Sequence, residues 1–100
     1  MLDLSQIVGF DWDDGNSFKS AEKHAVSQGE AEQVFADSGL LIAEDVKHSE
    51  REERYQAIGR TVGGRLLHVT FTLRDNQTRI RVISARSTSR KERAYYDQET

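Results

Sequence analysis

Cysteine and proline are both absent from this sequence of 100 residues, and it contains no long apolar segment. Without cysteine the chain has no disulfide framework, no thiolate zinc site and no cysteine nucleophile, so nothing favours an oxidising compartment. The first ten residues contain no Lys or Arg, which a signal peptide requires, and no segment approaches the length of a membrane span. We therefore expect a cytoplasmic protein that does not enter a membrane.

The common catalytic motifs are absent as well. The sequence has no P-loop, no GxGxxG, no HExxH and no GxSxG. Its three histidines, His24, His48 and His68, do not lie at metal-ligand spacings. We therefore expect neither a bound metal ion nor a cofactor, and the sequence disfavours a zinc enzyme or a nucleotide-dependent enzyme.

Charge is distributed unevenly along the chain. Residues 1–50 contain 3 Lys, no Arg and 11 Asp or Glu, a net charge of −8, whereas residues 51–100 contain 10 Arg, 1 Lys and 6 Asp or Glu, a net charge of +5. This asymmetry is typical of an anion-binding face supplied by the C-terminal half. The alternative is that the arginines only solvate strands and a helix.

Length and patterning predict a single α+β domain over residues 1–100. Hydrophobic residues make up 36% of the chain and charged residues 31%, so one modest core is expected. Helical spacing and two capping boxes, Ser27 with Glu30 and Ser89 with Glu92, predict helices over 17–24, over 28 to 36 or 37, and after 89. Period-two alternation predicts strands near 10–13, 40–42, 53–58, 66–73 and 79–86. The expected architecture is a small antiparallel sheet with two N-terminal helices and one C-terminal helix.

Several residue clusters could carry chemistry on RNA. Metal-free RNA cleavage needs a base for the ribose 2′-OH, an acid for the leaving 5′-oxygen and fixed cations for the charged phosphorane. Histidine, glutamate and arginine can supply these functions, and arginine can grip two phosphate oxygens at once. The clusters are Lys23-His24, His48, Glu53-Arg54, Arg79, Arg81, Arg86 and Tyr95-Tyr96.

Each cluster also has a purely structural interpretation. His24 can cap the first helix, and His68 can lie on the surface of the sheet. Glu53 and Arg54 can form an ion pair, and charges that alternate along a strand usually form a solvated face. The residue types alone therefore leave both a nuclease and an ordinary charged surface open.

The joint order of these segments resembles the BrnT family of type II toxins from Phe10 to Tyr96. The segments that fall in the family's order and approximate spacing are Phe10-Asp11-Trp12-Asp13, Lys23-His24, the stretch from Glu30 to Asp37, His48-Ser49-Glu50, Glu53-Arg54, Ile58-Gly59, Ile83-Ser84-Ala85-Arg86, Glu92-Arg93 and Tyr96. After Lys23-His24 the family has a glycine, where this chain has Ala25.

The resemblance implies a RelE-like fold and a metal-independent endoribonuclease that blocks translation. It also implies a BrnA-type antitoxin whose ribbon-helix-helix part contacts operator DNA, so that this chain would reach DNA only indirectly. On this basis His48 and Glu53 are the expected acid-base residues, and Arg54, Arg81 and Arg86 are expected to bind phosphate. Further RNA contacts are expected from Lys23, His24, Arg79 and Tyr96. The alternative is an inactive homologue that acts as a protein-binding module in a transcription-autoregulating complex.

Overall fold

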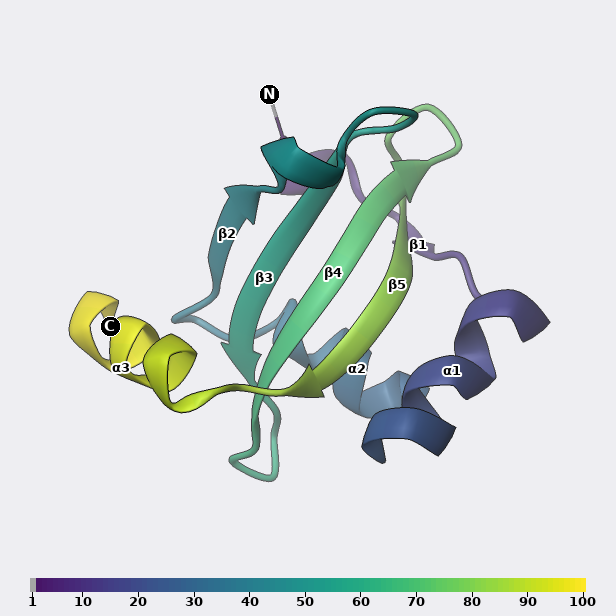
Figure 1. Cartoon of the computed structure of the whole chain (residues 1–100). Helices are drawn as coiled ribbons and strands as arrows, with labels where there is room; N and C mark the ends of the chain where they lie inside the picture. Colours follow the sequence, from purple (N-terminus) through teal and green to yellow (C-terminus); the bar gives the residue numbers. More distant parts are fainter. Residues whose placement is uncertain (1) are drawn as a thin grey trace.

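The computed structural model describes residues 2–100, apart from the side chains of residues 17–20. Among these residues five strands form one mixed sheet in the order β1-β5-β4-β3-β2, with helices packed around it (Figure 1). The elements are η1 (Leu4–Gln6), β1 (Gly9–Phe10), α1 (Asp14–His24), α2 (Gln28–Val34), β2 (Leu41–Glu44), η2 (Val46–His48), β3 (Arg54–Arg60), β4 (Leu66–Arg74), β5 (Arg79–Ser87) and α3 (Arg90–Glu99). Here η denotes a single-turn 3-10 helix.

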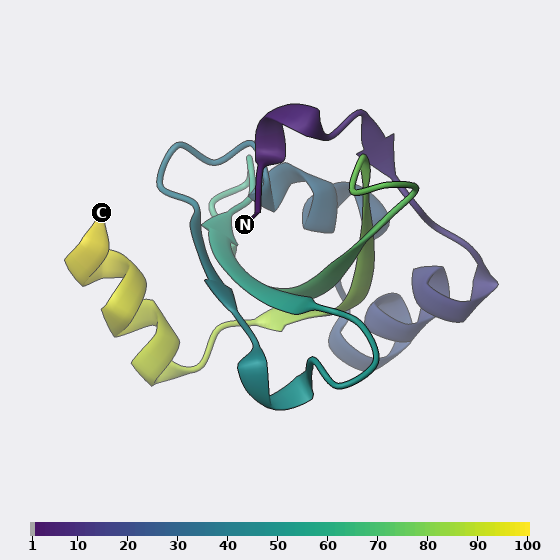
Figure 2. The ribbon, with the colours of Figure 1, turned by 90° about the horizontal axis from the view of Figure 1, so that it is seen from above.

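The sheet buries one face and leaves the other largely open. α2 lies behind the sheet in Figure 1, and the sheet curves around it when seen from above (Figure 2). On the buried face Phe71 stacks on Tyr55, with ring centroids 5.4 Å apart, and meets the edge of Phe35 at 5.0 Å. The rest of this core comes from alternating aliphatic residues of β4 and β5 and from the inner side of α2. The open face of β3, β4 and β5 carries mainly polar side chains.

A β-bulge in β5 sets which residues reach the open face. Thr72 pairs with Arg81 and His68 pairs with Arg86, so five residues of β4 (68–72) oppose six of β5 (81–86). The extra residue is Ile83, which falls between the pairs Phe71↔Val82 and Thr70↔Ser84. Because opposite residues of an antiparallel pair share a face, the bulge brings Arg86 to the same face as His68.

Both predicted capping boxes are present. The Ser27 side chain accepts from the Glu30 N–H while the Glu30 side chain accepts from the Ser27 N–H, which fixes the start of α2. Ser89 and Glu92 make the same reciprocal pair at the start of α3. Each box satisfies backbone N–H groups that have no partner inside the helix.

Arg65, which directly precedes β4, bonds to the C-terminal end of α1. Its guanidinium donates to the carbonyl oxygens of His24 (3.2 Å) and Ala25 (2.7 Å) and forms an ion pair with Glu30 (3.3 Å). Ala25 has φ of 54°, in the left-handed region that favours glycine. The family's glycine at this position therefore has a clear backbone explanation, and this chain adopts the same turn with an L side chain.

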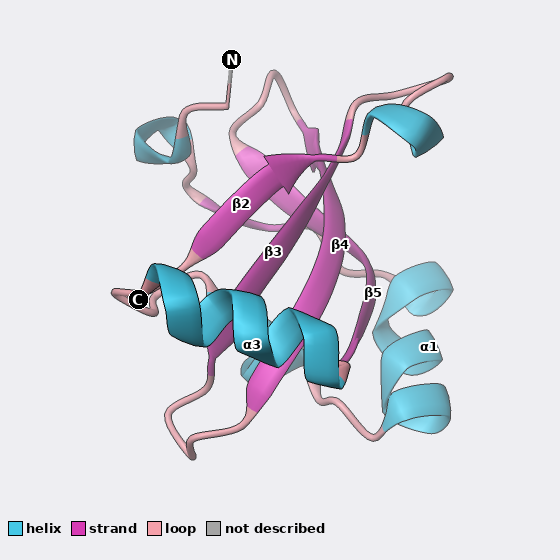
Figure 3. Ribbon diagram, turned by 60° about the vertical axis from the view of Figure 1, so that its left-hand side comes forward, coloured by secondary structure: helices cyan, strands magenta, loops and turns pink. Residues whose placement is uncertain are grey.

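α3 covers one end of the open face (Figure 3). Tyr96 packs there against Ile58, Leu66 and Leu41, which form a small apolar cluster separate from the main core. The Tyr96 hydroxyl donates to Asp37 Oδ2 at 2.7 Å. This contact ties the last helix to the turn that follows α2.

The α+β class and the two N-terminal helices and one C-terminal helix are confirmed. The sheet is not wholly antiparallel, because Gly9 and Phe10 pair in parallel with β5. The strand predicted over 10–13 is shorter, since the chain leaves the sheet after Phe10 and begins α1 at Asp14 instead of residue 17. The loop expected after the second strand contains the single turn η2.

Candidate functional site

The open face holds a cavity of about 400 Å³ between the end of α1, η2 and the strands β3 to β5. Five residues that the sequence indicated for RNA chemistry line it: Lys23, His24, His48, Arg54 and Arg86. The remaining lining residues are Asp45, Gln56, His68, Thr70, Ile83 and Ser84. The bulge at Ile83 therefore lies in the wall of the cavity.

A tightly bonded loop holds His48 at the rim of this cavity. The Asp45 N–H donates to the Arg54 carbonyl (2.8 Å), and the Ser49 hydroxyl donates to the Asp45 carbonyl (2.6 Å). The same hydroxyl accepts from the Arg54 N–H at 3.0 Å. These bonds fix the loop to the start of β3. The His48 side chain is 59% exposed, so one edge of its ring is free to meet a ligand.

The inner edge of the His48 ring contacts a carboxylate. Nδ1 lies 3.0 and 3.1 Å from the two carboxylate oxygens of Asp45. Because an ionised carboxylate only accepts, Nδ1 carries the proton, and in the neutral ring Nε2 carries the lone pair. Burial would raise the pKa of the Asp45 carboxyl, but the hydrogen bonds from His48 and Gln56 outweigh it and hold that pKa below its usual range. Asp45 is therefore ionised near neutral pH.

The hydrogen bonds continue along the floor of the cavity. Gln56 Nε2 donates to Asp45 Oδ2 (3.1 Å), and the Gln56 amide oxygen lies 3.1 Å from His68 Nε2. The carboxylate forces Gln56 to present its NH₂ group, so the amide oxygen must accept from His68. Burial lowers the pKa of His68, against the opposing effect of Glu92, so His68 is neutral near pH 7.

Arg86 closes the far side of the cavity in a two-bond pair with Glu92. Its Nη1 and Nη2 each donate to a Glu92 oxygen at 2.8 Å. The hydrogen bonds from Arg86 lower the pKa of Glu92 to about 2, against the effect of burial. Glu92 thus serves both as the capping residue of α3 and as the acid that orients Arg86.

Three other basic side chains line the cavity without such a partner. The side chains of Lys23, His24 and Arg54 form no hydrogen bond or ion pair with the described part of the chain. Unpaired cations around a cavity favour a bound anion, because nothing has to be displaced before it binds.

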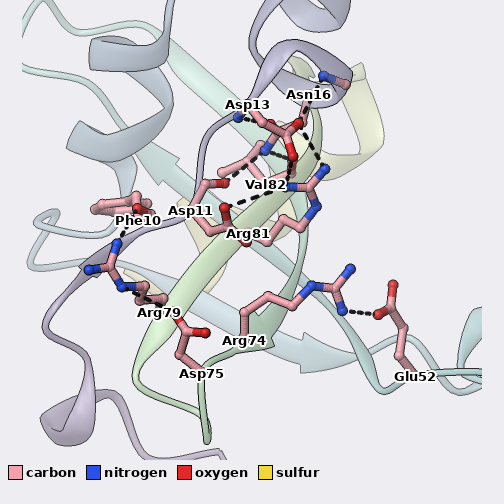
Figure 4. A network of polar contacts seen from close by, with 11 residues as sticks. Phe10, Asp11, Asp13, Asn16, Glu52, Arg74, Asp75, Arg79, Arg81 and Val82 are labelled. Carbon is pink, nitrogen blue, oxygen red and sulfur yellow. Dashed lines mark hydrogen bonds and ion pairs between the residues drawn. The ribbon is translucent and has the colours of Figure 1, made fainter.

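Arg81, which was expected to bind phosphate, lies outside this cavity. Its guanidinium donates to both carboxylate oxygens of Asp13 (3.0 and 3.1 Å) and lies 3.6 Å from Asp11 (Figure 4). Beside it, Asn16 Nδ2 donates to the carbonyl oxygens of Asp11 (3.0 Å) and Val82 (2.9 Å). Arg81 points away from the core, as predicted, but it joins β5 to the segment that leads into α1.

Glu53, the expected partner of His48, also lies outside the cavity. Glu53 Oε2 accepts a hydrogen bond from the Tyr55 hydroxyl at 2.7 Å. That bond, together with burial, raises the pKa of Tyr55 to about 12. Tyr55 belongs to the buried face of β3, whereas Arg54 lies on the open face, because side chains alternate along a strand. The carboxylate that contacts His48 is Asp45.

The structure places Arg79 and Tyr96 away from the cavity as well. Arg79 lies at the opposite end of β5 from Arg86, where it pairs with Asp75 at 3.2 Å and reaches the Phe10 carbonyl (Figure 4). Tyr96 is buried, and its hydroxyl is engaged by Asp37.

Two sequence signals could have located the residues that were missed. Asp45 precedes His48 by three residues, the spacing at which side chains meet on a helical turn. Gln56 and His68 follow the alternation that places Arg54 and Arg86 on the open face, and His68 was interpreted only as a surface residue of the sheet. The signals were present, but an antiparallel register was needed to bring them together.

Comparison with known proteins identifies the class. Residues 12–92 match the family described as "Ribonuclease toxin, BrnT, of type II toxin-antitoxin system". The class is therefore that of the ribonuclease toxins of type II toxin-antitoxin systems. The chain belongs to the BrnT family, and its family implies ribonuclease activity, an RNA substrate and a cognate antitoxin.

A solved structure shares the fold. The crystal structure of the Brucella abortus ribonuclease toxin, BrnT, superposes with a TM-score of 0.61 at 21% sequence identity, covering 83% of this chain and 99% of that one. No curated protein matches the sequence. Within residues 2–100, none of the helices has the length and apolar character needed to cross a bilayer.

Proposed function

We propose that this chain is a metal-independent endoribonuclease whose active site is the cavity between α1, η2 and β3 to β5. The observation that supports this most directly is the convergence of His48 with the unpaired basic side chains of Lys23, His24 and Arg54 around one cavity. These side chains come from three separate parts of the sequence. An arrangement of this kind can supply proton transfer and phosphate stabilisation without a metal ion.

In this proposal His48 Nε2 accepts the proton of a ribose 2′-OH, whose oxygen then attacks the adjacent phosphorus. The bond from phosphorus to the 5′-oxygen breaks, and His24, which also lines the cavity, donates the proton that this oxygen needs. Arg54 and Lys23 hold the phosphate as its charge rises, with Arg86 at the far wall. The products are a 2′,3′-cyclic phosphate and a free 5′-hydroxyl. Glu53, Arg79, Arg81 and Tyr96 have no direct part.

The test is cleavage of a labelled single-stranded RNA by the purified chain in excess EDTA. We expect cleavage to persist, cyclic phosphate ends to form, and His48→Ala to abolish both. A requirement for added Mg²⁺ or Mn²⁺ would overturn metal independence. Intact RNA under all conditions, together with normal growth of cells that express the chain, would instead support the inactive, protein-binding alternative.

We further propose that the cognate antitoxin is a BrnA-like ribbon-helix-helix protein that covers this cavity and makes the operator DNA contacts of the complex. The chain would then act in the cytoplasm as one toxin domain over residues 1–100. An open cationic cavity would let RNA compete with the antitoxin, so occlusion is the simplest form of inhibition. Co-expression of the neighbouring gene should restore growth, and RNA should be displaced from the complex. Simultaneous binding of both would contradict occlusion.

A further inference from the structure

The Asp45 carboxylate receives hydrogen bonds from two sides, from His48 Nδ1 and from Gln56 Nε2, and it is only 9% exposed. We propose that Asp45 is the positioning residue that holds His48 in the Nδ1–H tautomer and directs its Nε2 into the cation-lined cavity. Gln56, which is bonded in turn to His68, holds Asp45 in place. This inference rests on the proposed function, because it takes His48 as the proton-transfer group. Asp45 itself does not contact RNA.

In the series of hydrogen bonds that links His48, Asp45, Gln56 and His68, the direction of each bond follows from the Asp45 carboxylate. Asp45 can only accept, so Gln56 donates to it with its NH₂ group and accepts from His68 with its oxygen. His68 is 6% exposed and Asp45 9%, so a reversed Gln56 would leave its amide oxygen, an acceptor, facing the buried Asp45 carboxylate, which also only accepts. Such an unpaired buried group is costly. The surroundings therefore allow only one orientation of Gln56.

The same constraint applies to His48. Nδ1 faces the carboxylate and must be the protonated nitrogen, so Nε2 is the nitrogen available to a substrate. The backbone bonds of the loop keep the ring close to Asp45, because Asp45 and Ser49 are both bonded to Arg54 at the start of β3. His48 is thus oriented by the fold before any RNA binds.

Asp45→Asn tests the inference with almost no change in shape. The introduced amide has one oxygen and one NH₂ group, so it cannot accept from both His48 and Gln56 in the way the carboxylate does. Either its NH₂ group faces His48 and selects the Nε2–H tautomer, or it faces Gln56 and forces both Gln56 and His68 to reverse. We expect the first outcome, because only one exposed ring has to change.

A second variant restores the pattern while moving the charge. In Asp45→Asn/Gln56→Glu, the introduced amide accepts from His48 and donates to the introduced carboxylate, which accepts from His68. Every donor again faces an acceptor, and the net charge of the protein equals that of the wild type. If tautomer control is the function of Asp45, this double variant should recover the His48 tautomer that Asp45→Asn loses.

The tautomers are measured by long-range ¹H–¹⁵N NMR on full-length protein labelled at histidine, at about pH 8.5, where imidazoles are largely neutral. The chain has only three histidines. We expect Nδ1–H at His48 in the wild type and the double variant, and Nε2–H in Asp45→Asn. Thermal melts identify any variant that fails to fold.

Cleavage of the labelled RNA supplies the second readout. Asp45→Asn should lower kcat by roughly 10²- to 10⁴-fold with little change in KM, as removal of an orienting carboxylate does in other enzymes, and the double variant should recover at least tenfold. An Nε2–H or mixed His48 tautomer in the wild type would overturn the inference. A tautomer that switches as expected while cleavage stays unchanged would instead overturn the role of His48 in the proposed function.

Discussion

Arg86 and Glu92 face each other through two parallel hydrogen bonds of 2.8 Å, at the point where β5 ends and α3 begins. Because the pair joins the wall of the cavity to the cap of the last helix, its protonation affects both. The pKa of Glu92 is lowered to about 2 from an ordinary value of 4.5, and the largest cause is the hydrogen bonding from Arg86.

Acid should therefore weaken the fold in a defined range. A depressed carboxyl pKa contributes stability that is complete above about pH 4.5 and is lost as the pH falls through about 2. The contribution is at most about 3 kcal/mol. Urea unfolding of Glu92→Gln should show lower stability at pH 7 and a shallower decline between pH 5 and 2 than the wild type. Glutamine keeps the capping box, so parallel declines would show that the ion pair contributes nothing.

Arg54→Ala should reduce RNA cleavage with little effect on folding. Arg54 lines the cavity and its guanidinium has no partner in residues 2–100, so its loss removes a phosphate contact and breaks no bond. The loss of one transition-state contact costs about 10²- to 10³-fold in rate. Arg79→Ala is the matched control on the neighbouring sheet surface, and its cleavage should be normal. Equal loss in both variants would show that overall charge, and not the cavity, binds RNA.

The salt dependence of RNA affinity should distinguish Arg54→Ala from Arg79→Ala in the same way. Each phosphate contact contributes about −0.7 to the slope of log affinity against log salt for a single strand. Arg54→Ala should therefore flatten the slope by about that amount, and Arg79→Ala should leave it unchanged. The slope is measured by filter binding of a noncleavable, deoxy-substituted RNA at several salt concentrations.

Tyr96→Phe should lower stability and leave cleavage intact. The variant removes only the hydroxyl that donates to Asp37 Oδ2, a bond to a charged acceptor that is typically worth about 1.5 to 3 kcal/mol. The ring still packs against Ile58 and Leu66. Differential scanning calorimetry should show a lower melting temperature. A folded variant that melts normally but no longer cleaves RNA would return Tyr96 to the RNA-binding residues.

Arg81→Ala should release α1 from the sheet. Arg81 holds Asp13 and Asp11 at the start of this helix, and α1 carries Lys23 and His24 at its other end. Faster amide exchange in α1, a lower melting temperature and weaker RNA binding are expected together. Arg81→Lys keeps the charge but not the two-bond geometry, so it should be intermediate. Loss of RNA binding with unchanged exchange would indicate direct contact with phosphate.

Ala25→Gly should stabilise the protein. Ala25 has φ of 54°, where an L side chain costs roughly 1 to 2 kcal/mol, and the greater freedom of glycine in the unfolded chain returns about 0.4 to 1 kcal/mol of that. A net gain of about 1 kcal/mol is expected in urea unfolding. The substitution Ala21→Gly, inside α1, should instead destabilise by a similar amount. A gain in both variants would mean that relief of the positive φ at Ala25 is not the cause.

Local patterns predicted local structure well. The capping boxes at Ser27 and Ser89 require only residues three positions away, so the sequence is sufficient to find them. The strand faces followed from alternation, as Val82 in the core shows. The shared cavity of His48, Arg54 and Arg86 was predicted only as a set of residue types, through the family resemblance.

The partners of individual charges could not be predicted, because they depend on register. Arg81 meets Asp13, 68 residues away, and that contact holds it outside the cavity that Arg86 lines. Glu53 was expected to act with His48, and Asp45 was not among the expected site residues. Adjacent residues of an extended segment point to opposite faces, so Glu53 turns away from the face that carries Arg54.

The bulge at Ile83 makes the length of β5 as important as its composition. If Ile83 paired with Thr70 in a regular ladder instead of bulging, the segment from Ser84 onward would turn by half a period, so that Ala85 would face water and Arg86 would enter the apolar interior. Deleting Ile83 itself would remove the bulge and leave Ser84, Ala85 and Arg86 opposite the same residues of β4. We therefore expect the sheet to tolerate the loss of Ile83, and to exchange its inner and outer residues only when a residue is added or removed without a bulge that compensates for it.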